Sequence, residues 1–244
     1  MRIIATIEAR MSSTRLPGKV LLKAAGRPML EHLVSRLRAV PSLDGIVLAT
    51  TVNKTDDQLE DFSKAIGLDC YRGSESDVLA RVIGAGEFMH ADTLVEITGD
   101  CPVIDHDLIE QTIRMFLYNN VQYASNSLIR SFPDGMDTQV MQFESLKSSA
   151  QLTQHPLDIE HVSRFICNHP ELYPRVHLVA PPSLYWPELG LTLDEPRDYE
   201  LLKMIIEYFV PSNPLFSCSD IIQLLKQRPE WVAINQTVVR KGDA

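Results

Sequence analysis

The sequence predicts an α/β protein with a mostly parallel sheet. Apolar, β-rich runs alternate with helical patterns through the first half of the 244-residue chain. This spacing is typical of β-α-β units, in which a helix connects neighbouring parallel strands. Charged motifs directly follow two of the apolar runs, at the carboxyl ends of strands, where such sheets bind their ligands. We therefore expect a single domain over residues 1–244, with residues 125–185 as a smaller lobe for specificity or dimer contacts.

The elements of the first half can be placed in order. The predicted strands are RIIATI (2–7), GIVLAT (45–50), LDCYRG (68–73) and TLVEITGD (93–100). The predicted helices cover residues 28–40, 55–66, 76–90 and 105–119. Pro28 suits a first helical turn, where its missing N–H is not needed, and Gly67 suits a helix end. Strands and helices thus alternate, as a parallel sheet requires.

The second half is less regular. Strands are predicted at 121–126, after a Pro/Gly turn within 131–143, within 173–182 and at the start of 189–209. Helices are predicted over 158–168, in the remainder of 189–209 and near 219–227. Tyr185 and Trp186, beside three prolines, are interpreted as surface packing. No repeat, low-complexity tract or clean linker divides the chain.

Composition excludes several classes of function. The formal net charge of −9 argues against a general binder of nucleic acids or membrane surfaces, because no basic excess is available to meet phosphates. No run approaches the roughly 18 apolar residues of a membrane helix, and Glu8 and Arg10 interrupt the first apolar run before a signal peptide could form. The cysteines form no CxxC pair and are expected to be reduced thiols in a cytoplasmic protein.

The first charged motif is ARMSSTRLPGK at residues 9–19. Its cations are Arg10, Arg15 and Lys19, and its hydroxyls are Ser12, Ser13 and Thr14. It is not a Walker A loop, because Ser13 stands where that motif needs glycine. It still offers what a polyphosphate needs: turn N–H groups, hydroxyls and cations, with Gly18 allowing close approach of the backbone. The alternative is a solvated basic loop.

Two carboxylates follow apolar runs in the same way. Asp100 ends the run at 93–100, and Asp194 ends the run in LTLDEP at 191–196. If both face the basic loop, they could hold Mg²⁺ for phosphoryl or nucleotidyl transfer. The alternative for each is a helix cap, although Asp105 is the better-placed cap for the helix after Asp100.

Six motifs in a fixed order carry a family resemblance. They are ARMSSTRLPGK (9–19), YRGSESDVLAR (71–81), ITGDCPVID (97–105), FPDGMDTQV (132–140), EHV (160–162) and LTLDEPRDYELL (191–202). Over roughly residues 1–210 the chain resembles the cytidylyltransferases that activate acidic sugars. It is most like the spore-coat polysaccharide SpsF type and more distantly similar to the CMP-ketodeoxyoctonate and CMP-sialate synthetases.

The resemblance implies a fold and a reaction. The fold would be a Rossmann-like, three-layer α/β/α nucleotidyltransferase (GT-A-like) with a small inserted lobe at 125–185 for the acceptor or for dimerisation. The enzyme would transfer CMP from CTP to a nonulosonate-like sugar acid and release pyrophosphate, for surface polysaccharide or glycan synthesis. It would use Mg²⁺ and could be a homodimer.

The resemblance also implies roles for individual residues. Arg10, Ser13, Arg15 and Lys19 would bind the triphosphate, with Arg10, Lys19 and Asp100 acting in catalysis. Arg72, Ser74, Asp77 and Arg81 would lie around the base and ribose. Asp100 and Asp194 would hold Mg²⁺, and Asp134, Asp137, Glu160 and His161 would face the acceptor.

Two departures from the family pattern affect the acceptor and the metal. Ile159 stands where the family's acceptor motif has arginine, and Thr192 stands where the sialate enzymes have a further aspartate. The sugar, the choice of CTP over another nucleotide and the oligomeric state therefore stay open. Two alternatives also remain: a related nucleotidyltransferase or glycosyltransferase with another nucleotide or acceptor, and a nucleotide-binding scaffold without turnover. An Asp-x-Asp metal motif, usual in the glycosyltransferases, is not formed at Asp100.

Overall fold

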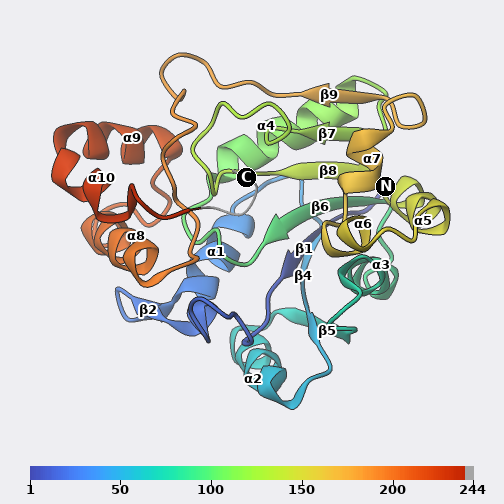
Figure 1. The fold of residues 1–244 in the computed structure, drawn as a ribbon, viewed down its shortest axis with the longest axis horizontal. Helices are drawn as coiled ribbons and strands as arrows, with labels where there is room; N and C mark the ends of the chain where they lie inside the picture. Colours follow the sequence, from blue (N-terminus) through green and yellow to red (C-terminus); the bar gives the residue numbers. More distant parts are fainter. Residues whose placement is uncertain (240–244) are drawn as a thin grey trace.

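A seven-stranded sheet runs through the protein within residues 1–239, the part described by this computed structural model (Figure 1). The strand order is β5-β4-β1-β6-β8-β7-β9. The strands are β1 (Ile3–Glu8), β4 (Gly45–Thr51), β5 (Asp69–Gly73), β6 (Thr93–Thr98), β7 (Tyr123–Ser125), β8 (Gln139–Gln142) and β9 (Arg175–His177). Only β8 pairs antiparallel with its neighbours among these strands, so the prediction of a mostly parallel sheet is confirmed.

Helices cover both faces of the sheet. They are α1 (Met29–Leu37), α2 (Asp57–Ile66), α3 (Val78–Phe88), α4 (His106–Tyr118), α5 (Phe143–Leu152), α6 (Pro156–Glu160), α7 (Arg164–Asn168), α8 (Pro196–Phe209), α9 (Cys218–Gln227) and α10 (Pro229–Asn235). Apolar residues of α1, α2 and α4 pack on one face, and those of α3, α5 and α7 pack on the other. The three-layer α/β/α architecture expected from the sequence is therefore present.

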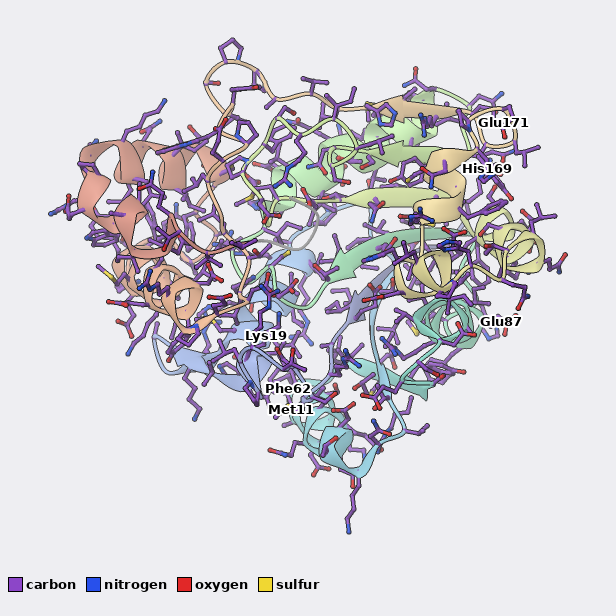
Figure 2. All side chains as sticks on the ribbon, in the orientation of Figure 1. Met11, Lys19, Phe62, Glu87, His169 and Glu171 are labelled. Carbon is purple, nitrogen blue, oxygen red and sulfur yellow. The ribbon has the colours of Figure 1, made fainter. Side chains whose placement is uncertain are left out.

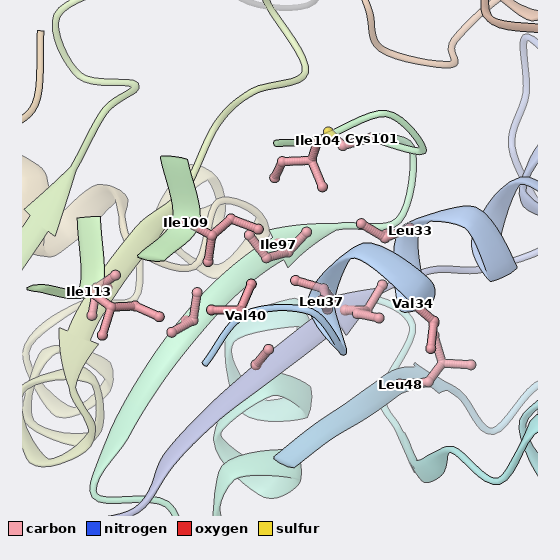
Figure 3. Close-up of a cluster of buried hydrophobic side chains, with 14 of the residues drawn as sticks. Leu33, Val34, Leu37, Val40, Leu48, Ile97, Cys101, Ile104, Ile109 and Ile113 are labelled. Atoms are coloured by element: carbon pink, nitrogen blue, oxygen red, sulfur yellow. The ribbon is translucent and has the colours of Figure 1, made fainter. Parts of the chain in front are cut away.

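The apolar spacing of the helices explains this packing. Leu33 and Leu37 of α1 lie four residues apart, so both point at the sheet, where they meet Leu48 of β4 and Ile97 of β6 (Figure 3). Because both faces of the sheet are covered, its central strands are almost continuously apolar, as the sequence runs indicated.

The C-terminal helices form a third apolar cluster. Helices α8, α9 and α10 gather at the left of Figure 1, on the side toward which β6 points. They pack around residues such as Leu191, Leu193 and Met136, which come from loops beyond the carboxyl ends of the strands. This cluster fixes the loop that carries Asp194 beside the end of the sheet.

Two predicted elements differ from the structure. The run at 191–193 was expected to be a strand, but its neighbourhood makes only one isolated bridge, between Asp134 and Gly190. Its backbone instead bonds to single residues of two loops, since Leu191 N donates to Asp134 O and Leu193 N donates to Asp100 O, both at 2.8 Å. The helix expected over 158–168 is two short helices, α6 and α7, separated at residues 161–163.

Some elements were not predicted at all. These are helices α5 and α10, the short β2–β3 hairpin (Lys23–Ala24 with Arg27–Pro28) and the 3-10 turns η1 (Lys19–Leu21) and η2 (Lys54–Asp56). The hairpin places Pro28 just before α1 rather than inside its first turn.

The cysteines and helices agree with two simpler expectations. Each of the four cysteines is a free thiol, with Cys101 and Cys218 buried and Cys70 and Cys167 half-buried. Within residues 1–239, no helix combines the length and the apolar character needed to cross a membrane.

Candidate active site

The site lies where the order of the strands reverses. The chain leaves β1 toward β4 and β5, then returns to the other side of β1 to form β6. The loops after β1 and β6 diverge at this point and leave a crevice at the carboxyl ends of the two strands. Figure 2 shows Met11 and Lys19, from the loop after β1, at the opposite end of the sheet from Glu87, His169 and Glu171.

A glycine lets the two loops begin side by side. The N–H of Gly99 donates to the carbonyl of Glu8 at 2.9 Å. A Cβ on Gly99 would lie 2.8 Å from both that carbonyl oxygen and the side chain of Ala9. The glycine of the ITGDCP motif is therefore required by the close approach of the two strand ends, and it brings the next residue, Asp100, to the crevice.

The loop at 9–19, which we call the cradle loop, is folded back on itself. The N–H of Gly18 donates to the carbonyl of Met11 at 3.0 Å, and Gly18 has the left-handed φ of 69° that favours glycine. The N–H of Met11 is anchored to a carboxylate oxygen of the fully buried Asp56 at 2.8 Å. These bonds set the start of η1, and with it the position of Lys19.

Lys19 joins the two predicted metal ligands. Its Nζ lies 2.9 Å from Oδ2 of Asp100 and 3.0 Å from Oδ1 of Asp194, and only 13% of its side chain is exposed. Burial alone would raise the pKa of Asp100, but the nearby ammonium and its hydrogen bond hold that pKa below the usual value. Burial likewise opposes the charge on Lys19, yet the two carboxylates raise the pKa of the amine. The Asp100 carboxylate and the Lys19 ammonium therefore keep their charges near neutral pH.

Arg15 extends the same cluster. Its Nη2 lies 3.0 Å from Oδ1 of Asp194, and its Nη1 lies 3.7 Å from Oε1 of Glu195. The structure thus brings together four of the residues singled out from sequence: Arg15, Lys19, Asp100 and Asp194.

Helix caps do not account for the two aspartates. The residue that caps α8 is Glu195, whose side chain and that of Asp198 form a reciprocal capping box. The residue that caps α4 is Asp105, as expected, and its carboxylate accepts from the N–H of Asp107 at 2.8 Å and of Cys218 at 2.7 Å. The carboxylates of Asp100 and Asp194 are left to face the crevice.

The donor set suits a divalent cation. Two carboxylate oxygens converge within 3.0 Å of one cationic nitrogen, so the ammonium of Lys19 stands where a positive charge is favoured. Hard oxygen ligands of this kind are the ones Mg²⁺ prefers. Thr192, which replaces an aspartate of the sialate enzymes, donates its hydroxyl to Asp134 at 3.3 Å.

Arg10, the remaining cation of the cradle loop, is paired with a residue that sequence reasoning missed. Its Nη1 lies 3.1 Å from Oε1 of Glu75, whose carboxylate also accepts from Ser12 at 3.0 Å and from Asn53 at 2.6 Å. Hydrogen bonds from Asn53 and Ser12, with Arg10 nearby, lower the pKa of Glu75. Glu75 lies inside the YRGSESDVLAR motif, so its position in that motif was the available signal.

Arg72 is one of the four residues predicted around the base and ribose. Arg72 donates to the carbonyls of Thr51 and Asn53 and pairs with Asp57 and Glu60, so it ties β5 to β4 and α2. Its nucleotide-binding role stays a prediction.

Ser74, Asp77 and Arg81 hold the turn between β5 and α3. Asp77 caps α3 by accepting from the N–H of Ala80 at 2.8 Å, and its own N–H donates to the hydroxyl of Ser74 at 3.1 Å. Arg81 is buried and donates to the carbonyl of Ser74 at 2.6 Å. Contact of these residues with a nucleotide likewise stays a prediction.

Two carboxylic side chains, the half-buried Glu8 and the buried Glu96, lie on the α3 face of the sheet. Burial, reinforced by Glu96, raises the pKa of Glu8 well above its ordinary value, and burial raises the pKa of Glu96 to about 7. Oε1 of Glu8 has no hydrogen-bond partner within residues 1–239. Sequence analysis missed both, although a carboxylate inside an apolar strand run is the signal that marks them.

The predicted acceptor residues divide into two groups. Asp134 and Asp137 line a cavity of about 140 Å³, the inner cavity, together with Asn126, Ser127 and Arg130. Burial, with Asp134 and Asp100 nearby, raises the pKa of Asp137 to about 7, while Arg130 acts in the other direction.

Glu160 and His161 do not line the inner cavity. They are exposed at the end of α6, which packs against α3. Ile159, in place of the family's arginine, is half-buried one residue before them, and the hydroxyl of Ser163 donates to Gln139 at 2.5 Å.

A doubly wound sheet with a cationic loop after its first strand and two carboxylates at the reversal point defines a nucleotidyltransferase-type site. The family model of the cytidylyltransferases matches residues 4–216, and the chain belongs to this family. It is therefore a CTP-dependent nucleotidyltransferase, and cytidylyltransferases generally use a divalent metal. The expected fold and family are confirmed.

Known proteins agree with this assignment. The chain is 34% identical to the spore coat polysaccharide biosynthesis protein SpsF of Bacillus subtilis, over 93% of this chain and 95% of that protein. A cytidylyltransferase structure from Leptospira borgpetersenii superposes with a TM-score of 0.91 at 30% identity, covering 98% of this chain and 100% of that one. The CMP:2-keto-3-deoxy-manno-octonic acid synthetase complexed with CTP shares the fold, with a TM-score of 0.65 at 17% identity over 85% of this chain and 99% of that one.

Proposed function

We propose that the protein transfers CMP from CTP to a hydroxyl of a nonulosonate-like sugar acid, with release of pyrophosphate, for surface polysaccharide or glycan synthesis. The observation that carries this proposal is the Lys19–Asp100–Asp194 cluster at the reversal point of the sheet. The similarity to SpsF, whose name refers to spore coat polysaccharide, supports the polysaccharide role.

Positioning and charge would supply most of the catalysis. The acceptor hydroxyl attacks the α-phosphorus, the bond to the pyrophosphate oxygen breaks, and the hydroxyl proton passes to solvent water. Arg10, Arg15 and Lys19 would hold the triphosphate in line and balance the charge that develops on the leaving pyrophosphate. Asp100 and Asp194 would hold Mg²⁺, which would supply positive charge for the phosphates and acidify the attacking hydroxyl.

Ligand binding would exchange the partners of the cradle. Each of its three cations is paired with a carboxylate: Arg10 with Glu75, Arg15 with Asp194, and Lys19 with Asp100 and Asp194. If Asp100 and Asp194 held a cation, Lys19 and Arg15 would be free to pair with the phosphates. The carboxylates thus hold the cations in place before substrate arrives.

The acceptor would occupy the inner cavity. Asp134 and Asp137 can accept hydrogen bonds from sugar hydroxyls, and Arg130 can pair with a carboxylate. Ser13 would bind the triphosphate, and Glu160 and His161 would contact the acceptor from outside the inner cavity. Ser13 lies in the cradle loop, where its Oγ is 3.4 Å from the backbone nitrogen of Leu16.

Pyrophosphate release tests the proposal directly. The purified protein is incubated with Mg²⁺, each of the four nucleoside triphosphates, and a panel of sialic, legionaminic, pseudaminic and ketodeoxyoctonic acids. We expect release only with CTP and one or more of these acids. Release with another nucleotide, or with CTP and acceptors that are not sugar acids, would point to the related transferases instead. Binding of CTP without release would contradict the proposed acceptor.

We also expect a cytoplasmic homodimer. Light scattering on the purified protein, coupled to size-exclusion chromatography, measures the mass of the particle. A mass of about one chain at working concentrations would rule out the dimer.

A further inference from the structure

The C-terminal segment closes one side of the site. Helix α10 and residues 236–239 follow the last residue of the family match, at 216. The side chain of Asn235 is buried and donates to Gly190 O at 3.0 Å and to Asp198 Oδ1 at 2.8 Å. Farther along, Arg197 donates to the hydroxyl of Thr237 at 2.8 Å.

The same segment reaches the cradle loop. Nη1 of Arg15 donates to the carbonyl of Val239 at 3.3 Å. The chain from α10 to Val239 is thus attached to the Asp194 loop, to α8 and to a predicted phosphate-binding arginine. This C-terminal segment is therefore part of the site.

A second and larger cavity lies between this segment and the loop before α8. This outer cavity has a volume of about 590 Å³. Trp186, Leu189 and Gly190 form one wall, and Val232, Gln236 and Val238 form the other. Trp186, which sequence analysis interpreted as surface packing, is therefore a wall of a cavity.

Arg130 connects the outer cavity to the inner one. It lines both, and the inner cavity also contains Asp134, whose backbone forms the isolated bridge with Gly190 of the outer cavity. Binding sites for small molecules typically measure about 300–1,000 Å³, so the inner cavity of about 140 Å³ is too small for a whole sugar acid. The remainder of the acceptor would have to extend past Arg130.

We propose that the outer cavity is a subsite for an N-acyl substituent of the acceptor. This inference rests on the proposed function and names the part of the sugar that this chain selects. The carboxylate end of the acceptor lies at Arg130 and the inner cavity, and the acylated carbon chain lies between Trp186 and Val238.

The mixed lining fits an acyl amide. Trp186, Leu189, Val232 and Val238 offer apolar surface for the methyl group, where its burial is favourable. Gln236 and Glu188 place an amide and a carboxylate group on the same cavity, where an amide N–H and carbonyl need partners. A sugar that carries only hydroxyls would leave the apolar walls in contact with water.

Filling the outer cavity tests the inference. Val238→Trp puts bulk into the cavity, whereas Ala233→Trp adds the same side chain at an exposed position of α10 that does not line it. Trp186→Ala removes a wall and serves if Val238→Trp does not fold, which thermal unfolding reports. Each protein is assayed with CTP and two acceptors: N-acetylneuraminate, and ketodeoxynonulosonate, which has a hydroxyl in place of the acetamido group.

The expected result is a selective loss. The wild-type protein should prefer the acylated acid, and Val238→Trp should lower kcat/KM for that acid about tenfold or more, mainly through KM, because pockets of this kind discriminate small apolar groups by about 10–200-fold. For the deaminated acid, kcat/KM should change by no more than about twofold, as should the KM for CTP. Ala233→Trp should behave as wild type with both acids.

Two results would overturn the inference in different ways. If the wild-type protein shows no preference for the acylated acid, or Val238→Trp and Trp186→Ala affect both acids equally, the outer cavity is not an acyl subsite, although the transfer to sugar acids stands. If CTP binds but no sugar acid releases pyrophosphate, the proposed function itself fails and the subsite fails with it.

Discussion

At the scale of single residues, the site is a set of charges that balance one another. Lys19 lies between two aspartates, and Arg15 shares one of them. Half-buried charges of this kind are stable because each has a partner, and removing one partner leaves the others uncompensated. The same arrangement makes Lys19 a competitor of any metal for Asp100 and Asp194.

Replacing Lys19 should therefore separate metal binding from catalysis. In Lys19→Met we expect kcat/KM for CTP to fall by about 100-fold or more. Removing one preorganised group that stabilises the negative charge of the transition state typically costs about that much in rate. Affinity for a divalent cation without nucleotide should rise, because the competing ammonium is gone. Pyrophosphate release measures the first effect, and calorimetric titration with Mg²⁺ or Mn²⁺ measures the second.

Lys23→Met is the matched control, since Lys23 is an exposed lysine in the neighbouring hairpin. It should leave both measurements unchanged. Normal turnover in Lys19→Met would remove Lys19 from the catalytic group, and unchanged metal affinity would show that the two aspartates are not the metal site.

Asp137 should make stability depend on pH. Burial and its acidic neighbours raise its folded pKa to about 7, whereas an unfolded aspartate titrates near a pKa of about 4. Between these values the unfolded chain has already lost the proton that the folded chain keeps. Asp137 therefore lowers the free energy of unfolding by an amount that grows from about pH 4 to about pH 7 and stays constant above about pH 7.

Asp137→Asn should remove that loss. We expect the variant to be more stable than wild type by about 1–2 kcal/mol at pH 8 and to differ little at pH 4. The expected difference at pH 8 is smaller than the full pKa shift implies, because the side chain is only partly buried. Urea unfolding at the two pH values measures the difference. An equal effect of the substitution at both pH values would assign it to lost contacts rather than to titration.

At the scale of elements, the turn at 132–137 and the loop at 189–194 hold each other in place. Gly135 has a φ of 97°, and a Cβ there would lie 2.7 Å from the backbone carbonyl group of Leu191. The same contact region includes the bridge between Asp134 and Gly190. Because this loop continues to Asp194, the packing of one turn positions both the inner cavity and a predicted metal ligand.

Gly135→Ala should therefore damage stability and activity together. We expect a loss of about 3 kcal/mol or more in the free energy of unfolding, from left-handed strain of about 1–2 kcal/mol plus the displaced backbone. Gly26→Ala is the control, since Gly26 has a φ of 79° but no atom within 4 Å of the position that a Cβ would take, so it should show the strain alone. Equal losses in the two variants, by urea unfolding, would mean that the contact with Leu191 contributes nothing.

The sequence pattern predicted correctly the helices and strands whose apolar side chains repeat regularly along the chain. The apolar spacing of α1 and the β-rich run of β1 were readable because a helix or strand with one partner surface repeats its side chains regularly. The run at 191–193 has the same composition as a strand, but its partners are the single carbonyls of Asp134 and Asp100. Tertiary contacts decide whether an apolar run pairs with a strand or bonds to single carbonyls of loops. The sequence pattern therefore could not distinguish the two cases.

The site was predictable in the same measure. Asp100 and Lys19 could be placed together, because the carboxyl ends of parallel strands meet at one edge of the sheet. Glu75 and Arg130 were missed, since each reaches the site from a loop whose path no periodicity describes. Glu160 and His161 were grouped with Asp134 by their motif, but the structure puts them at the end of α6 and outside the inner cavity.

At the scale of the whole molecule, binding must overcome an acidic protein. The net charge is −9, and a nucleoside triphosphate brings further negative charge to a site that contains Asp100, Asp194 and Glu195. The cations of the cradle loop can neutralise the charge of the nucleotide only when they are released from their carboxylates. Metal and nucleotide should therefore bind cooperatively, each making the site more favourable for the other.

Thermal unfolding should reveal this cooperation. We expect Mg²⁺ alone and CTP with a chelator each to raise Tm by no more than about 1–2 °C, and the two together by about 5–10 °C, since a ligand at 100 times its Kd adds about 2.7 kcal/mol and each kcal/mol is worth about 2–4 °C at this size. In Lys19→Met, Mg²⁺ alone should already raise Tm, because the aspartates no longer have the ammonium as a partner. The combined shift should then exceed the sum of the separate ones by less than in wild type. Additive shifts in the wild-type protein would mean that Asp100 and Asp194 keep Lys19 when the nucleotide binds, and the exchange of partners would have to be abandoned.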